Sequence, residues 1–239
     1  MEKKDPFAAT IPAPTAARPL LGLTILVIED SRYACEAMRL LCLRSGARIR
    51  RADCIRSARR HLQVYRPSVV IIDLGLPDGD GSELIEELSK IEPRVDVILG
   101  TSGDLSGEEA SAAAGADGFL PKPVTSLAVF QQAVLSNLPA DRQPAGPRSV
   151  ADEEILPDLI AFQDDMAHIA DVLDDPEDEK TLDYVAQFIG GVARSAQDKG
   201  LEQAADALAQ ARSSGMSVHA ATTQLTGLIK QRLTQKLAI

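Results

Sequence analysis

The chain has 239 residues, of which 45% are hydrophobic and 25% are charged, and its net charge is −10. These values are typical of a globular protein with a buried core, and the negative charge argues against nucleic-acid binding over the whole surface. Three cysteines without metal-ligand spacing, and no apolar run of about 18 residues, predict a cytoplasmic protein without membrane contact.

The first elements lead from a proline-rich arm to a pair of acids. Residues 1–20 carry several prolines and lack the apolar core of a signal peptide, so they are predicted to be a disordered arm. Residues 23–28 are apolar and partly β-branched, which predicts a buried strand, and Glu29 and Asp30 follow directly. Ser31 is a suitable N-cap for the next helix.

The stretch around Asp73 has the clearest pattern in the chain. Residues 69–72 are Val-Val-Ile-Ile, as expected for a strand buried on both faces inside a parallel sheet. The strand ends at Asp73, and the turn-forming sequence Leu-Gly75-Leu-Pro-Asp-Gly-Asp-Gly81 follows. Asp73 is therefore predicted at the carboxyl end of a central strand, where open α/β sheets place their functional sites.

Strands and helices alternate through this half of the chain. The patterns predict five strands at residues 23–28, 47–52, 69–73, 95–99 and 118–120. They predict five helices at residues 31–43, 55–65, 81–91, 106–114 and 126–137. Residues 21–138 should therefore form an α/β domain with a doubly wound, five-stranded parallel sheet, in which the arginine-rich second strand is an outer strand.

The carboxyl ends of these strands should meet at one edge of the sheet. They carry the acids Glu29, Asp30 and Asp73, and also Thr101 and Lys122. Three convergent carboxylates repel one another, and an all-oxygen ligand set without His or Cys favours Mg²⁺. A Lys and a Thr at the same point would complete a phosphate site, so the predicted chemistry is phosphoryl transfer onto Asp73.

With these motifs in order, residues 23–138 resemble the receiver domain of two-component response regulators, which has a flavodoxin-like fold. The resemblance implies that Asp73 is the phosphoacceptor and that Thr101 and Lys122 contact the phosphoryl group. It implies that Asp30, Asp73 and the Gly75 backbone carbonyl bind Mg²⁺ directly, and Glu29 through water. It also implies a response regulator in a phosphorelay, a switch rather than an enzyme apart from slow self-dephosphorylation, with a histidine kinase or phosphotransfer protein as partner.

Two more positions match the family, and three depart from it. Phe119 matches the aromatic switch residue, and Pro123 matches a proline whose preceding peptide bond is often cis. Glu29 replaces the first Asp of the acid pair, Ser102 stands where the family usually has Ala, and Gly100 replaces an apolar strand residue. That glycine is expected to loosen the loop and so to weaken switch coupling.

The second half of the chain shows almost no strand pattern. Residues 139–150 are predicted to be a linker, and residues 151–239 an all-helical domain. The predicted helices cover residues 152–173, 177–199, 201–213 and 217–237. Four helices with short connections favour an antiparallel bundle, closed within one chain or shared in a homodimer.

The charge of this half is uneven, since residues 152–183 are strongly acidic. A solvated helical face is the favoured interpretation. The alternative is that this acidic segment docks against the arginine-rich segment at residues 48–60.

Three functions of the helical half are compared. Residues 215–229 distantly resemble a DNA-binding helix-turn-helix, although the basic residues come late for a recognition helix. Residues 187–215 are similar in pattern to a histidine phosphotransfer bundle in which Gln187 replaces the phosphorylated histidine. The favoured hypothesis is a protein-interaction or dimerisation bundle, controlled by the receiver and derived from such a degenerate phosphotransfer fold, that contacts a downstream protein.

Overall fold

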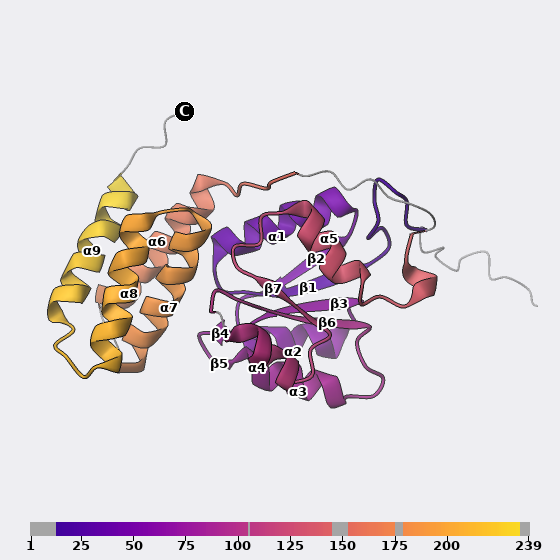
Figure 1. Cartoon of the computed structure of the whole chain (residues 1–239), viewed down its shortest axis with the longest axis horizontal. Helices are drawn as coiled ribbons and strands as arrows, with labels where there is room; N and C mark the ends of the chain where they lie inside the picture. The colour runs from indigo at the N-terminus through magenta and orange to yellow at the C-terminus, as the bar shows by residue number, and fades with distance from the viewer. Residues whose placement is uncertain (1–12, 105, 145–152, 175–178, 235–239) are drawn as a thin grey trace, which may run out of the picture.

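The computed structural model describes residues 13–104, 106–144, 153–174 and 179–234. Two parts lie side by side along its longest axis, an α/β unit and a bundle of helices (Figure 1). The α/β unit is formed by the first half of the chain and the bundle by the second half, as the sequence predicts.

The α/β unit contains a five-stranded parallel sheet. Its strands are β1 (Thr24–Ile28), β2 (Arg48–Ala52), β3 (Val69–Asp73), β6 (Val97–Ser102) and β7 (Gly118–Pro121). They are arranged in the order β2-β1-β3-β6-β7, with every pair parallel. The predicted fold class is confirmed: β3 is central and fully buried, and the arginine-rich β2 is an edge strand.

Helices cover both faces of this sheet (Figure 1). Helices α1 (Arg32–Ser45) and α5 (Leu127–Leu135) lie on one face, and α2 (Ile55–Val64), α3 (Gly81–Lys90) and α4 (Gly107–Ala113) lie on the other. Successive residues of a strand point to opposite faces. Ile71 therefore joins the core under α1 and α5, whereas Ile72 joins the core under α2 and α3.

The segment after β3 forms a small hairpin that the sequence did not predict. Its strands are β4 (Gly75–Leu76) and β5 (Gly79–Asp80), which pair antiparallel. The Gly-, Pro- and Asp-rich pattern predicts a turn there, and two-residue strands are too short to add a periodic signal. The hairpin brings the chain back so that α3 starts at Gly81, directly beside the end of β3.

Gly100 has a packing role in the structure. A Cβ added to Gly100 would lie 2.0 Å from Oγ of Ser111 on α4. Ser111 is buried, so the glycine in β6 lets α4 approach the sheet closely. This close helix–sheet contact gives Gly100 a packing role, and its expected effect on switch coupling stays a prediction.

The end of the predicted arm, the beginning of the predicted linker and the start of the predicted helical domain all contact the α/β unit. Residues 1–12 and 145–152 lie outside the described residues, but Leu20, at the end of the predicted arm, is fully buried. The beginning of the predicted linker forms a 3-10 helix, η1 (Ala140–Arg142), and Arg142 pairs with Asp96. Ile155 is buried in the α/β core, and its backbone N–H donates to the carbonyl of Thr125.

The second half forms a four-helix bundle within one chain. Its helices are α6 (Leu159–Asp174), α7 (Glu179–Ser195), α8 (Lys199–Ser213) and α9 (His219–Thr234). Their apolar faces form one core, which includes Phe162, Met166, Val185, Ile189, Leu208, Leu225 and Ile229. No helix among the described residues is long and apolar enough to cross a membrane.

The first helix of the bundle begins at Leu159, later than predicted. Leu156 precedes Pro157, and a residue before proline is disfavoured in the helical conformation. The Asp158 carboxylate accepts a hydrogen bond from the backbone N–H of Ile160 at 2.9 Å and so marks the helix start. The residues before it extend along the α/β unit, where Glu154 forms an isolated bridge with Ser126.

Asp198 joins two helices of the bundle, and its removal should weaken the bundle. Its carboxylate accepts hydrogen bonds from two backbone N–H groups at the start of α8 and pairs with Arg232 of α9. We expect Asp198→Ala to lower the free energy of unfolding by about 2 kcal/mol, measured by denaturant titration. Lys199→Ala removes only an exposed ion pair and should leave the free energy of unfolding nearly unchanged.

The same contact predicts a pH dependence. The hydrogen bonds from Arg232 lower the pKa of Asp198 below its ordinary value of 3.8. The folded state therefore binds this proton more weakly than the unfolded state, and the stabilisation is fully present above pH 4. It should be lost as the pH falls through the lowered pKa, so the difference between wild type and Asp198→Ala should shrink in acid. An unchanged difference at low pH would contradict this role of the carboxylate.

Candidate functional site

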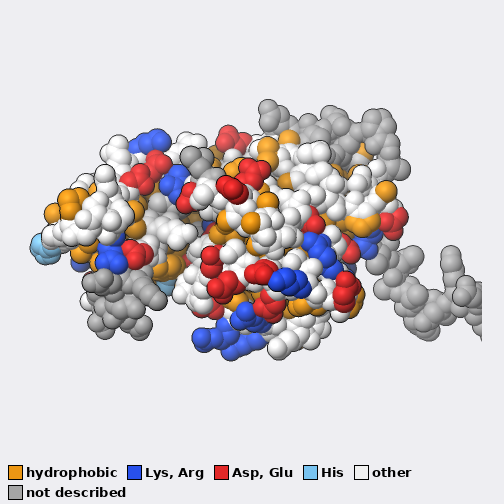
Figure 2. Space-filling model, turned by 60° about the horizontal axis from the view of Figure 1, so that its bottom comes forward, with side chains coloured by type: hydrophobic (Ala, Val, Ile, Leu, Met, Phe, Trp, Pro, Cys, Tyr) orange, Lys and Arg blue, Asp and Glu red, His pale blue; other side chains and the backbone are white. Residues whose placement is uncertain are grey.

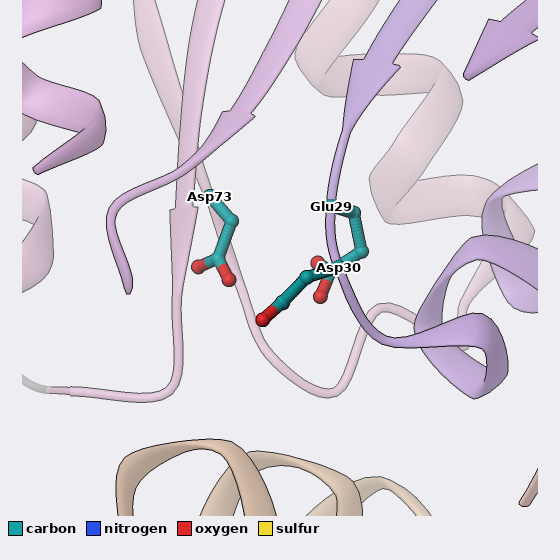
Figure 3. Close-up of side chains that lie close together, drawn as sticks. All are labelled: Glu29, Asp30 and Asp73. Atoms are coloured by element: carbon teal, nitrogen blue, oxygen red, sulfur yellow. The ribbon is translucent and has the colours of Figure 1, made fainter. Parts of the chain in front are cut away.

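Three carboxylates converge at the carboxyl edge of the sheet. Glu29 and Asp30 follow β1, and Asp73 ends the neighbouring strand β3. One ligand oxygen from each lies within 4.8 Å of those of the other two, and the side chains point toward one another (Figure 3). Glu29 and Asp73 are buried, and Asp30 is partly buried. The sequence prediction that these acids meet is confirmed, and the cluster could bind a metal ion.

Lys122 supplies the positive charge of the site. Its ammonium group lies 2.8 Å from Glu29 Oε2 and 2.9 Å from Asp73 Oδ2. Burial alone would lower the pKa of Lys122, but the two carboxylates outweigh it and hold the pKa above its usual value. Lys122 is therefore a fixed cation beside Asp73.

The acids outnumber the lysine, so the site keeps excess negative charge. Burial raises the pKa of Asp30 to about 7, and repulsion from Asp73 adds to the effect. Burial also raises the pKa of Glu29 well above its usual range despite the contact with Lys122. These carboxylates would take up protons near neutral pH. A bound divalent cation would stabilise their ionised form instead.

The other predicted site residues lie at or near this cluster. Gly75 lines the same cavity as the three acids and Lys122. Thr101 is paired with Asp73 across β3 and β6, and its hydroxyl donates to the carbonyl of Leu120 at 2.7 Å. Phe119 does not line the cavity. The Phe119 ring lies beside the start of α4, because a Cβ added to Gly107 would be 3.1 Å from that ring. The Lys122–Pro123 peptide bond is cis.

The helical bundle docks on the α/β unit beside this site. Asp165 on α6 is buried, and its carboxylate accepts hydrogen bonds from Ser31 Oγ at 2.7 Å and from the backbone N–H groups of Arg32 and Tyr33. These groups form the N-terminus of α1, where unpaired N–H groups attract a negative charge. A carboxylate from the bundle thus caps a helix of the α/β unit.

Further contacts extend this interface to the acidic cluster. The hydroxyl of Tyr184 on α7 donates a hydrogen bond to Asp30 Oδ2 at 2.8 Å. Tyr33 belongs to the apolar core of the bundle and packs edge-on against Phe162 at 5.9 Å between ring centroids. The bundle therefore shares both core residues and polar contacts with the α/β unit.

The acidic segment contacts a different part of the α/β unit from the one considered in the sequence. Asp164 pairs with Arg32 at the start of α1, at 2.8 Å. Among the residues that the structure describes, Arg59 of the arginine-rich segment pairs instead with Glu87. Basic side chains gather at the lower edge of the α/β unit in Figure 2. The ion pair of Asp164 is thus with α1, whereas Arg51 and Asp164 line one cavity between the two parts. Docking of residues 152–183 on residues 48–60, the alternative to a solvated face, stays a prediction.

Helix α7 faces the acidic cluster across a cavity of about 440 Å³. A helix in the orange colours of the bundle crosses directly below the three carboxylates in Figure 3. From α7, Gln187, Gly191 and Arg194 line the cavity, together with Asp73 and Lys122 of the α/β unit. The sequence analysis assigned Gln187 only by resemblance and missed Tyr184 and Arg194. The spacing of these residues along one face of α7, with two glycines inside the helix, was the available signal.

A parallel sheet in the order β2-β1-β3-β6-β7, with an acid cluster and a lysine at its carboxyl edge, defines a flavodoxin-like receiver fold. Residues 25–134 match the family model of the response regulator receiver domain. The chain therefore contains a response regulator receiver domain.

Several known proteins are similar to this part of the chain. The KDP operon transcriptional regulatory protein KdpE of Escherichia coli K12 is 31% identical over 99 residues, which cover 41% of this chain and 44% of that protein. The virulence transcriptional regulatory protein PhoP of Salmonella typhimurium LT2 is 28% identical over 102 residues, which cover 42% of this chain and 46% of that protein. The chain thus spans less than half the length of these curated relatives.

Among solved structures, the signal receiver domain of a signal transduction histidine kinase from Syntrophus aciditrophicus is similar at 24% identity. The match covers 53% of this chain and 98% of that one, with a TM-score of 0.45.

Proposed function

We propose that this protein is a cytoplasmic response regulator whose receiver domain accepts a phosphoryl group on Asp73 in a two-component phosphorelay. The observation that carries the proposal is the placement of Asp73 between Lys122 and the acids Glu29 and Asp30. The three free cysteines fit a reducing compartment. A histidine kinase or a phosphotransfer protein is the proposed donor.

The residues of the site fit the chemistry of phosphoryl transfer. An Asp73 carboxylate oxygen forms a bond to phosphorus as the bond between phosphorus and the donor breaks, and the donor keeps that electron pair. The Lys122 ammonium, 2.9 Å from Asp73 Oδ2, neutralises charge on the phosphoryl oxygens. Glu29, Asp30, Asp73 and the Gly75 carbonyl would hold Mg²⁺, which supplies further charge neutralisation when bound.

Transfer would alter the contacts of Thr101. Its hydroxyl donates to the Leu120 carbonyl in the structure and would turn to donate to a phosphoryl oxygen on Asp73. Phe119, the neighbour of Leu120 on β7, would respond to this change as the switch residue. The protein would act as a switch, with turnover limited to slow hydrolysis of its own acyl phosphate.

Incubation of the full chain with acetyl phosphate and Mg²⁺ tests the proposal. Intact mass spectrometry should show the addition of one phosphoryl group, and peptide mapping after reduction of the acyl phosphate should place it on Asp73. Absence of Mg²⁺-dependent labelling would reject the proposed function.

The affinity for Mg²⁺ should depend on pH. Because the pKa of Asp30 is raised to about 7 without metal, a proton competes with the cation below that pH. We expect binding to be roughly tenfold weaker at pH 6 than at pH 8, measured by isothermal titration calorimetry in two buffers with different ionisation enthalpies. The titration should also show proton release at pH 7. Equal affinity at both pH values would contradict protonation of the ligands.

For the helical bundle we propose a protein-interaction domain related to phosphotransfer bundles but lacking the active histidine. The support is that Gln187 lies over the phosphorylation site, where a Cβ added to Gly75 would be 2.1 Å from Gln187 Nε2. An amide cannot carry a phosphoryl group, so the bundle would bind rather than transfer. Its partner would be a downstream protein, and α9 packs lengthwise against the bundle (Figure 1), which does not favour a DNA-binding helix-turn-helix.

A further inference from the structure

One face of α7 is shaped to cover the cavity above Asp73. Tyr184, Gln187, Gly191 and Arg194 follow one another at intervals of three or four residues, so they lie on the same side of the helix. Tyr184 contacts Asp30, and the other three line the cavity. This face therefore extends from one wall of the phosphorylation site to the other.

Glycines on the receiver loops make room for the side chains of this face. A Cβ added to Gly75 would lie 2.1 Å from Gln187 Nε2, and a Cβ added to Gly103 would lie 2.7 Å from Arg194 Nη2. Gln187 thus sits over the loop after β3, and Arg194 over the loop after β6. Between them, a Cβ added to Gly191 would meet no heavy atom within 4 Å. The glycine in α7 leaves the centre of the cavity open.

Arg194 is a positively charged residue of this cavity that has no acidic partner among the described residues. Its Nε atom is buried and has no hydrogen-bond partner within the described part of the chain. A buried guanidinium N–H without an acceptor is costly, and the best acceptors for it are carboxylate and phosphate oxygens. The cavity beside it is the space that a phosphoryl group on Asp73 would enter.

We propose that the phosphoryl group on Asp73 is bound jointly by the receiver and the bundle, with Arg194 and Gln187 of α7 as anion-binding residues opposite Lys122. This inference rests on the proposed function of Asp73. The Arg194 guanidinium and the Gln187 amide donate hydrogen bonds to phosphoryl oxygens from above, and Gly191 leaves the space for them. The phosphoryl group then gains partners that exist only while the bundle is docked.

The charges around the cavity indicate that phosphorylation should favour the docked position of the bundle. Before phosphorylation, Lys122 already has two carboxylate partners, whereas Arg194 has none among the described residues. Phosphorylation adds negative charge beside Arg194 and should strengthen the docked state. The docked bundle in turn shields the acyl phosphate from water.

Beryllofluoride, which mimics the phosphoryl group, gives a direct test on the full chain with Mg²⁺. Fluorine NMR titration should show binding to the wild type and about tenfold weaker binding to Arg194→Met, which corresponds to the loss of one charge-assisted hydrogen bond. The matched control is Lys230→Met on α9, an exposed residue outside the cavity, which should bind as the wild type does. Circular dichroism verifies the helical content of each variant.

A second variant does not depend on removing a charge. Gly191→Leu should improve the helix propensity of α7 while filling the cavity, and we expect it to weaken beryllofluoride binding at least as much as Arg194→Met. Unchanged affinity in both variants would overturn the joint site. Tighter binding in Arg194→Met would also overturn it, because the bundle would then obstruct the anion. If the wild type itself binds no beryllofluoride, the proposed function fails rather than the role of Arg194 alone.

Discussion

Asp73→Asn should abolish phosphoryl uptake from acetyl phosphate while the protein stays folded. The substitution keeps the size of the side chain and removes the nucleophilic oxygen anion. Lys122 retains its contact with Glu29 at 2.8 Å, so the buried ammonium is not left without a partner. Intact mass spectrometry after incubation with Mg²⁺ and acetyl phosphate should show no added phosphoryl group, whereas the wild type should take up one.

Asp104→Asn is the matched control for this result. Asp104 lines the same cavity but is exposed, and its carboxylate only accepts a hydrogen bond from the backbone N–H of Ser106. An asparagine oxygen can accept the same bond, so this variant should label as the wild type does. Labelling that persists in Asp73→Asn would assign the phosphoryl group to another carboxylate, and Asp30 would be the next candidate because it lies within the same cluster.

The sequence predicts the α/β half well because its signals are local. Residues 69–72 are apolar on both faces, and this pattern alone places Asp73 at the end of a buried strand. Since parallel strands share a carboxyl edge, Glu29, Asp30 and Lys122 then follow from strand order. The structure brings these four residues together as expected.

The position of the bundle could not be predicted in the same way. Amphipathic spacing indicates that α6 and α7 bury one face, but it does not indicate which surface the other face meets. The capping of α1 by Asp165 joins residues more than a hundred positions apart, and Ser31 alone already satisfies the sequence pattern of an N-cap. The local sequence contains no signal for a second capping group that comes from a distant helix.

The contacts of the bundle explain why polar residues of α7 are directed at the receiver rather than at solvent. The Tyr184 hydroxyl donates a hydrogen bond to an oxygen of Asp30. Burial, together with the neighbouring acid, raises the pKa of the Tyr184 hydroxyl. The hydroxyl therefore stays protonated at neutral pH and donates to Asp30 when that group is ionised. Docking of the bundle and ionisation of the acidic cluster are coupled through this hydrogen bond, which stabilises the charged form of Asp30.

Gly81→Ala should damage both the fold and the site. Gly81 is buried at the first position of α3, and its N–H donates to the carbonyl of Leu74. A Cβ there would lie 1.9 Å from the backbone oxygen of Asp73 and 3.0 Å from Cα of Leu74. Both are backbone atoms, which cannot turn away as a side chain can. Either α3 must leave the sheet or the end of β3 must move.

We expect this variant to lose about 4 kcal/mol of the free energy of unfolding, or to fail to fold, in denaturant titration. Gly227→Ala is the matched control, because a Cβ at that position of α9 meets nothing within 4 Å and should stabilise the helix by about 1 kcal/mol. If Gly81→Ala does fold, acetyl phosphate should label it more slowly than the wild type, since Asp73 is displaced relative to Lys122. A variant with wild-type stability and wild-type labelling would show that α3 is not held against β3 as the structure describes.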